Sequence, residues 1–580
     1  MKKTNLAISS LVMLAMFLSG CSSNSQTVRE VSTKQLDVYE GGAKACSLDC
    51  YYLDDIGAPY IKLADLENYR MDTQFAKGFP IPDYDYSYSK GVMTAKQTYN
   101  EQTYTIEFDA YRDEIRSEKF SEALDLFHIG TPLDFVAADY SPIINPIVND
   151  DTKTNHSVTL SLKEYGIDLY AYENSVLISF NIANCLFFNS GEKTFTYNGR
   201  ALFESNEKSS TSPSYSIYNS YTNDEKNVTR NENTALYNRN EMMFLLNTFF
   251  GRSDESTIHD FRDYAKYLGI YDALASTTPS EAFLALRKLI MTIDDLHSGS
   301  GQPSPAVGTL YGDDEKDQEL TKAVNSTAVN FGYRMTNFIK MNFDLSELRN
   351  KTIEKKDINN YSYYDDNMII RFDGFTRASN SSVFLGDGKL GDVSYSTNSF
   401  NLFYDAFKDL KANHPEVKNI ILDESINGGG DCTTLIELAG FFMKEVNFSS
   451  QNTVTGKVTN HTYKVDTNLD GTYDDNDFQA NGYNVYVLIS PVSFSCGNLL
   501  PMVMKNNKAA SIIGTTSGGG CCIVLPMVTS QGDFFQISGN QKLGTYVDGV
   551  FNSNDNGIHP DIYVGPDDFY DLSKLVSYLK

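Results

Sequence analysis

Apolar and polar residues alternate along much of the first third of the chain. In the segment 102–108, Tyr104, Ile106 and Phe108 fall on one face, and residues 158–162 repeat the pattern. A period of two is typical of half-buried strands. We therefore expect a mixed α+β accessory domain over residues 36–203.

The pattern changes after this region. Residues 204–234 are rich in Ser, Asn, Thr and charge and poor in large aliphatic residues, which predicts a linker. A helical segment follows over 235–300, and its apolar residues recur with the period of an amphipathic helix at 241–250 and 279–296.

The second of these helices has its own start signals. Thr278 and Glu281 have the spacing of a capping box, and Pro279 suits the first helical position. The helix would present His297 at its C-terminal end, where the helix dipole favours an imidazolium ion. A general base becomes such an ion when it accepts a proton, so His297 is a candidate base.

The last part of the chain alternates strands and helices. A connecting region, 301–365, leads into a segment, 366–580, in which apolar runs alternate with amphipathic stretches. This alternation predicts an α/β unit with a parallel sheet and right-handed crossovers. The expected strands are 368–372, 417–423, 483–490 and 511–514, and the expected helices are 399–413, 434–446 and the residues after Ser495.

Two turns of this unit carry candidate chemistry. The glycine-rich turn Asp423–Gly430 and the turn at Ser495 both lie where a strand ends, and reactive groups of parallel sheets gather at that edge. A serine between a strand and a helix presents its hydroxyl beside unpaired N–H groups, a geometry suited to acyl transfer. The pattern indicates a serine hydrolase.

Composition excludes some partners and frameworks. A chain of 580 residues is expected to form several domains, and a formal net charge of −27 argues against nucleic-acid binding. Of the eight cysteines, Cys21 directly follows an apolar N-terminal segment, and the odd number that remains argues against a complete disulfide framework.

The N-terminus predicts the location of the protein. Lys2 and Lys3 precede an apolar stretch over 6–18 that is too short to span a bilayer, which indicates a signal peptide over residues 1–20. The residues Leu-Ser-Gly before Cys21 resemble a bacterial lipobox. The resemblance implies a lipid-modified Cys21, a tether over 21–35, and a bacterial membrane lipoprotein on the extracytoplasmic face.

Several motifs in order resemble the C-terminal processing (tail-specific) serine peptidases, and within them the branch related to the tricorn core. The resemblance covers residues 235–580 and implies a crotonase-like or ClpP-like parallel-sheet catalytic core. Ser495 stands at the position of the nucleophile. The motifs are Asp423–Gly430, Ser493–Asn498, Ile512–Gly520, Gly557–Ile562 and Asp295–Ser298.

The resemblance also assigns the partners of Ser495. Gly520 occupies the position where members with a Ser/Lys dyad carry lysine, so the tricorn-like Ser/His arrangement is favoured, with His297 as the base. A strict register with the family places Asn554 at the position of the third catalytic group, and we expect Asp555, one residue later, to take that role. The expected oxyanion donors are the N–H groups of Cys496 and of Gly429 or a neighbour.

Cys496 is an alternative nucleophile, because a cysteine at a helix N-terminus can be reactive. We prefer Ser495, since the family register assigns Cys496 to a packed position.

A separate acidic loop, 466–477, has the spacing of a calcium-binding loop with glycine at its sixth position. We expect structural Ca²⁺ there, with a solvated acidic turn as the alternative. The expected ligands are Asp466, Asn468, Asp470, Asp474 and Asp477.

Together these features predict a lipid-anchored extracytoplasmic serine endopeptidase that needs no cofactor for catalysis and acts on peptide or protein substrates. One alternative is a catalytically silent peptide-binding lipoprotein on the same fold. Another is a surface carbohydrate-binding lipoprotein, which the many aromatic residues suit and the absence of tryptophan disfavours.

Overall fold

The computed structural model describes residues 28–65, 85–99, 102–120, 141, 143–151, 157–188, 194–327, 330–377 and 394–579. The predicted signal peptide, Cys21 and the first part of the predicted tether lie outside these residues. The last residues of that predicted tether belong to the folded structure, because strand β1 begins at Val31. In the described part of the chain no helix has the length and hydropathy needed to cross a membrane.

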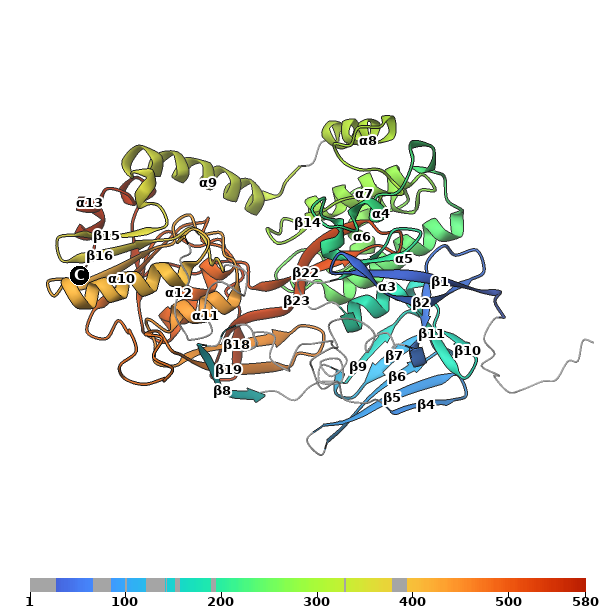
Figure 1. Cartoon of the computed structure of the whole chain (residues 1–580), viewed down its shortest axis with the longest axis horizontal. Helices are drawn as coiled ribbons and strands as arrows, with labels where there is room; N and C mark the ends of the chain where they lie inside the picture. Colours follow the sequence, from blue (N-terminus) through green and yellow to red (C-terminus); the bar gives the residue numbers. More distant parts are fainter. Residues whose placement is uncertain are drawn as a thin grey trace, which may run out of the picture.

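The N-terminal lobe comprises the described residues from 28 to 327 except β8, and it contains two sheets (Figure 1). The first has seven strands in the order β10-β11-β3-β2-β1-β13-β12, and the second has five in the order β4-β5-β6-β7-β9. The predicted strand at 102–108 is confirmed as β6. The bounds are β1 Val31–Glu40, β2 Ala43–Leu53, β3 Tyr60–Lys62, β4 Asp85–Ser89, β5 Val92–Tyr99, β6 Gln102–Asp109, β7 Glu114–Ser117, β9 Val158–Ser161, β10 Tyr170–Tyr172, β11 Ser175–Ser179, β12 Phe195–Tyr197 and β13 Leu202–Glu204.

The helices of the predicted helical segment pack on the same core as these sheets. Buried residues of α5, such as Leu245 and Leu246, belong to one apolar cluster with Val38 and Ile178 of the sheet. The stretch 204–234 is structured, with short helices and the buried Tyr218, because its small aromatic cluster covers the edge of the first sheet. The helices are α3 Phe180–Ala183, α4 Tyr215–Tyr218, α5 Glu232–Phe249, α6 Phe261–Tyr267, α7 Pro279–Met291 and α8 Glu315–Ser326.

Helix α7 begins at Pro279 as predicted, with Thr278 as its N-cap, but it differs from the prediction in its capping bond and at its C-terminal end. It ends at Met291 rather than near Leu296, so His297 lies in the following turn and not at a helix C-terminus. Asp294 adopts a φ of 52° in this turn, which reverses the chain direction before the histidine. Thr278 makes no capping hydrogen bond, since Glu281 accepts one from Ser276 instead. The dipole therefore gives no support to a charged His297.

The C-terminal lobe, formed by the described residues from 330 onward together with β8, is built on a six-stranded sheet in the order β15-β16-β17-β20-β21-β25. Its strands from β16 to β25 pair in parallel, as predicted, and β15 adds an antiparallel edge. The bounds are β15 Asn360–Tyr364, β16 Asn367–Arg371, β17 Asn419–Asp423, β20 Asn484–Ile489, β21 Ser511–Gly514 and β25 Ile562–Tyr563.

Helices cover both faces of this sheet. Alternate strand residues such as Ile420 and Leu422 pack against α10, α11 and α12, whereas Ile421 and Leu488 pack against α9 and α13. Continuous apolar strands are the expected sequence of a sheet buried on both faces. The helices are α9 Tyr333–Thr352, α10 Ser399–Asn413, α11 Cys432–Ala439, α12 Cys496–Asn506 and α13 Leu572–Ser577; α11 ends before its predicted limit because Val446 begins β18.

A third sheet joins the two lobes. Its order is β14-β23-β18-β19-β8, with β22 and β24 also paired to β23. Strand β8 comes from the predicted accessory domain, yet it pairs with β19, while Phe535 and Ile537 of β23 lie in the core of the N-terminal lobe. Figure 1 shows β22 and β23 running between the lobes. The bounds are β8 Ile144–Asp151, β14 Gly299–Ser300, β18 Val446–Asn452, β19 Val458–Val465, β22 Cys522–Val528, β23 Phe534–Val547 and β24 Val550–Asn552.

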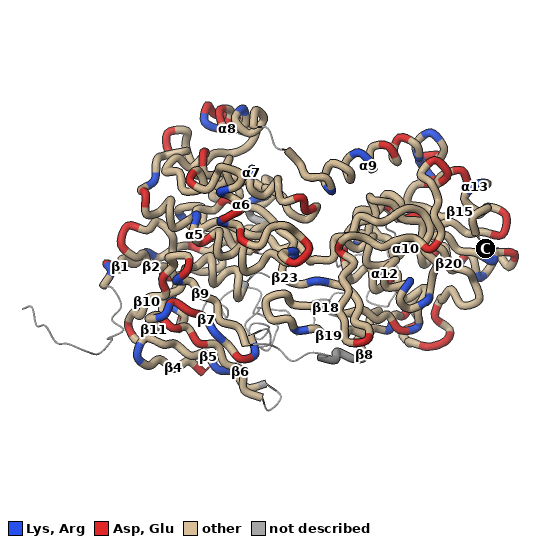
Figure 2. The backbone as a smooth tube through the Cα atoms, turned by 180° about the vertical axis from the view of Figure 1, so that it is seen from behind, with Lys and Arg blue, Asp and Glu red and all other residues tan. Residues whose placement is uncertain are grey.

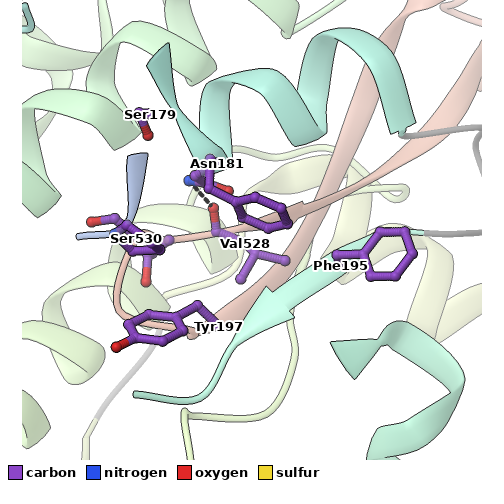
Figure 3. A pocket seen from close by; sticks show the side chains of 9 residues that line it. Ser179, Asn181, Phe195, Tyr197, Val528 and Ser530 are labelled. Carbon is purple, nitrogen blue, oxygen red and sulfur yellow. Dashed lines mark hydrogen bonds between the residues drawn. The ribbon is translucent and has the colours of Figure 1, made fainter. Parts of the chain in front are cut away.

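A small pocket marks the seam between the N-terminal lobe and the end of β22 (Figure 3). Asn181 donates hydrogen bonds to Val528 O at 2.7 Å and to the buried Glu241 at 3.0 Å. None of the predicted site residues lines this pocket. Hydrogen bonds of Asn181 therefore hold the end of β22 against the N-terminal lobe.

Acidic and basic residues are interspersed over both lobes in Figure 2. The seven cysteines of the described residues are unpaired.

Glu424 in the turn after β17 has an unusual environment. Its side chain is fully buried, and neither carboxyl oxygen has a hydrogen-bond partner among the described residues. Burial, together with the neighbouring Asp423, raises the pKa of Glu424 well above its ordinary value of 4.5. The folded state therefore retains a proton that the unfolded chain releases above about pH 4.5.

We expect Glu424→Gln to be more stable than the wild type at pH 8, with a smaller difference at pH 5. The wild type loses up to about 1.4 kcal/mol of folding free energy per pH unit in this window, because only the unfolded carboxyl is ionised. Chemical denaturation at both pH values measures the difference. Exposed Glu118→Gln is the control. A difference between the wild type and Glu424→Gln that is the same at both pH values would contradict a protonated Glu424.

Candidate functional site

Ser495 lies between the end of β20 and the start of α12, at the carboxyl ends of the parallel strands. It is the N-cap of α12 and has a φ of 57° and a ψ of −122°. A non-glycine residue in such a conformation costs on the order of 1–3 kcal/mol and persists only when its surroundings hold it. Here the Ser495 N–H donates to Gly519 O at 2.9 Å. This conformation presents the side chain at the helix start, as expected for a nucleophile.

The glycine-rich turn packs directly on this serine. A Cβ atom placed on Gly429, whose φ is +103°, would lie 2.7 Å from the Ser495 Cβ. Asn427 holds the two turns together: its carbonyl accepts from Phe494 N at 3.0 Å, and its Oδ1 accepts from Gly429 N at 2.9 Å. Only glycine fits at 429 without displacing Ser495.

The N–H groups expected to act as oxyanion donors differ in their hydrogen bonding. The N–H of Cys496 begins α12 and has no acceptor in the described part of the chain, as expected at a helix start. The Gly429 N–H donates to Asn427 Oδ1. The next residue, Gly430, forms a β-bridge with Phe375, and its own N–H has no acceptor among the described residues. The geometry thus favours Gly430 as the neighbour that assists Cys496.

The Cys496 thiol points away from the nucleophile position. Its Sγ donates to Gly430 O at 3.1 Å and lies 3.6 Å from Cys432 Sγ. The contact with Cys432 and burial raise the pKa of Cys496 well above its ordinary value, so the thiol is protonated. A thiol in this state is a poor nucleophile.

His297 reaches the nucleophile turn from the N-terminal lobe. Its ring packs against Phe494, the residue before Ser495, with ring centroids 4.6 Å apart. The Nδ1 atom lies 3.4 Å from Ser538 Oγ, and the carbonyl accepts from Gln536 Nε2 at 2.7 Å. Burial lowers the pKa of His297 below its ordinary value of 6.5, which keeps the ring neutral.

Ser495 and His297 are neighbours without a direct bond. Among the described residues the Ser495 hydroxyl has no hydrogen-bond partner. His297 is held near Ser495 by the contact of its ring with Phe494, and the two catalytic candidates do not bond each other directly. Catalytic hydrogen bonds often tighten only when substrate is present.

Asp555 anchors a buried charge cluster beside the histidine. Its Oδ2 accepts from Arg252 Nε at 2.6 Å and from Arg334 at 3.1 Å. Although burial opposes ionisation, these two arginines hold the pKa of Asp555 well below its usual range. Arg252 also lies 3.4 Å from Asp295, two residues before His297. Asp555 therefore faces the arginines and makes no hydrogen bond to the imidazole within the described structure.

Sequence reasoning missed the residues that organise this cluster. Arg252 follows α5, Arg334 begins α9, and Ser538 lies within β23. Each is an isolated polar residue without a local motif, so only the three-dimensional arrangement identifies it. Arg334 additionally donates to Gly518 O at 3.1 Å, which connects α9 to the turn that holds Ser495.

The acidic loop 466–477 is closed by its own backbone. Asp466 accepts from Gly471 N at 2.8 Å, and Asp477 accepts from Thr467 N at 2.8 Å. Burial, and then the repulsion between them, raises the pKa of Asp477, and burial likewise raises that of Asp466. No three carboxylates of this loop bring their oxygen atoms within 4.8 Å of one another in the described structure. Calcium at this loop stays a prediction.

Part of the C-terminal lobe is similar to a known protein family. The model of "Peptidase family S41" matches residues 389–564, a range that contains Ser495, the glycine-rich turn and Asp555 but not His297. None of the curated proteins compared with this chain gives a significant match.

Solved structures show similarity at low identity. A photosystem II D1 C-terminal processing protease is 18% identical over 36% of this chain and 46% of its own, less than half of its length, with a TM-score of 0.27. Mature CPAF in complex with lactacystin is 12% identical over 59% of this chain and 96% of its own, with a TM-score of 0.36. The tricorn protease is 10% identical over 86% of this chain and 46% of its own, with a TM-score of 0.27.

The family match falls on the segment in which the strained serine, its helix N-terminus and the glycine-rich turn converge, and residues 389–564 are accordingly similar to the serine-type peptidases of family S41.

Proposed function

We propose that this protein is a lipid-anchored extracytoplasmic serine endopeptidase in which Ser495 is the nucleophile and His297 the general base. The observation that carries the proposal is the position of the His297 ring against Phe494, beside a serine held at positive φ at the start of α12. The finer description of the C-terminal lobe as a crotonase-like or ClpP-like core belongs to the same proposal.

The contacts of the histidine support this role. If Nδ1–H donates to Ser538 Oγ, the other ring nitrogen, Nε2, is unprotonated and free to accept a proton. As Ser495 Oγ attacks the substrate carbonyl, Nε2 takes the hydroxyl proton and later returns it to the leaving amine. The N–H of Cys496, with Gly430 or Gly429, stabilises the developing oxyanion. Water then hydrolyses the acyl-enzyme.

Asp555 acts as a positioning residue in this scheme. Its carboxylate holds Arg252, and Arg252 in turn contacts the Asp295 side chain and the Asp294 carbonyl just before His297. The charge of Asp555 therefore reaches the histidine through the arginine rather than by a direct bond. Attachment through Cys21 would keep this site at the membrane surface, where exposed or unfolded peptide segments are the substrate class.

A fluorophosphonate probe tests the catalytic pair. We expect the probe to label Ser495 in the purified chain, and Ser495→Ala and His297→Ala to lose labelling and to reduce kcat for peptide hydrolysis on the order of 10⁴-fold or more. Mass spectrometry locates the adduct, and Ser573→Ala, at an exposed serine, is the control. A folded wild type that stays unlabelled would favour the catalytically silent peptide-binding protein.

The pH profile tests the state of the base. Because burial lowers the pKa of His297, we expect the acid limb of kcat/KM to have its midpoint below pH 6.5. Activity is lost as pH falls through this midpoint, since the protonated ring cannot accept the serine proton. Initial rates from pH 4.5 to 8 measure the midpoint, and a value above 6.5 would exclude a buried neutral His297 as the base.

Calcium at the acidic loop is tested by thermal unfolding. We expect saturating Ca²⁺ to raise Tm by about 2–4 °C and a chelator to reverse the rise, because a ligand that binds only the folded state stabilises it. Asp466→Asn should abolish the response. Asp475→Asn, at a loop position outside the proposed ligands, is the matched control, and a Tm that ignores both calcium and chelator would contradict the site.

A further inference from the structure

A second cluster of potential ligands lies beside the charge cluster. The ligand atoms of Cys521, Cys522 and Asp555 all lie within 4.8 Å of one another, and all three side chains are buried. Cys521 Sγ is 3.4 Å from Asp555 Oδ1 and 4.0 Å from Cys522 Sγ. The proposed peptidase mechanism uses neither thiol.

These separations suit one tetrahedral ion. With metal–sulfur and metal–oxygen bonds of about 2.3 and 2.0 Å, two sulfurs of a tetrahedron lie about 3.8 Å apart, and a sulfur and an oxygen about 3.5 Å apart. The Cys521–Asp555 and Cys521–Cys522 distances differ from these by a few tenths of an ångström, and the Cys522 ligand atom lies within 4.8 Å of that of Asp555. Binding therefore requires the Cys522 and Asp555 side chains to move closer together.

The local backbone explains why two adjacent cysteines share one side. Neighbouring residues of a regular strand point to opposite faces. Cys521 precedes β22, and the pairing of β22 with β23 is irregular between Cys522 and Val524, so the alternation is broken here. Glycines at 519 and 520, with φ of +79° and +83°, turn the chain into this position.

The charge balance also favours an ion. Asp555 uses Oδ2 for Arg252 and Arg334, while Oδ1 accepts from Cys521 N at 3.2 Å and faces the Cys521 thiol, so the carboxylate can bind a metal through a second lone pair of Oδ1 and keep its arginines. Binding of M²⁺ with release of the two thiol protons leaves the total charge of ligands and ion at −1, the value that Asp555 alone has now. The arginines that compensate Asp555 therefore compensate the loaded site equally well.

We propose that Cys521, Cys522 and Asp555 form a binding site for one thiophilic divalent cation, of the class of Zn²⁺ or Cd²⁺. Two thiolates select such ions over Ca²⁺ and Mg²⁺, which prefer oxygen ligands. The arginines at Oδ2 orient the carboxylate from outside the coordination sphere. The ion would fasten the turn that follows Gly519, the acceptor of the Ser495 N–H, to the segment that carries Asp555.

Cadmium titration of the reduced full chain tests this site without reference to peptidase activity. We expect the ultraviolet band of a cadmium thiolate to saturate at one equivalent, with two protons released per ion. Cys521→Ser, Cys522→Ser and the double variant should lose the band, and Asp555→Asn should raise Kd about tenfold or more. Cys432→Ser and Cys185→Ser are controls that keep it.

Two outcomes would overturn the proposal: a wild type without a saturable band, and a band that persists in the folded double variant. Circular dichroism establishes whether each variant folds. If the double variant does not fold, the single variants and a Zn²⁺-dependent rise in the wild-type Tm, absent from Cys522→Ser, decide the question. Because no readout depends on hydrolysis, loss of fluorophosphonate labelling and loss of metal binding remain separate results.

Discussion

The ion cluster of Arg252, Asp295 and Asp555 is the interaction on which the site depends. The three side chains are 4%, 1% and 1% exposed, and they come from three parts of the chain: the segment after α5, the histidine turn and the segment before β25. Desolvating such charges is costly, and the cost is offset only when every partner is in place. The cluster therefore couples formation of the histidine turn to the docking of the two lobes.

The nucleophile turn shows a second kind of constraint. Ser495 at positive φ is held by Gly519 on one side and by the glycine-rich turn on the other, and the Asn427 side chain in turn holds Gly429. The geometry around the hydroxyl is therefore set by backbone hydrogen bonds and by the close approach of glycines, which have no side chain.

The sequence predicted the parallel sheet well, since its apolar runs and the amphipathic helix at 399–413 are strong local signals. It also placed Ser495 at a helix start. The end of α7 was wrong, because the apolar stripe continues through Ile293 into a turn that Asp294 makes at positive φ. Arg252 and Arg334 could not be predicted, because their partners lie hundreds of residues away or across the lobes and leave no periodicity in the sequence.

Strand β8 has a consequence for how the chain acquires its structure. Asp151 pairs with Thr459, roughly three hundred residues later, and Phe535 of β23 completes a core that begins with Leu36. Such long-range pairings give a high contact order, and loop closure over these lengths must precede the stabilising contacts. The sheets of the N-terminal lobe contain only strands from residues 31–204, but their apolar core stays incomplete until β23, near the end of the chain, packs against it.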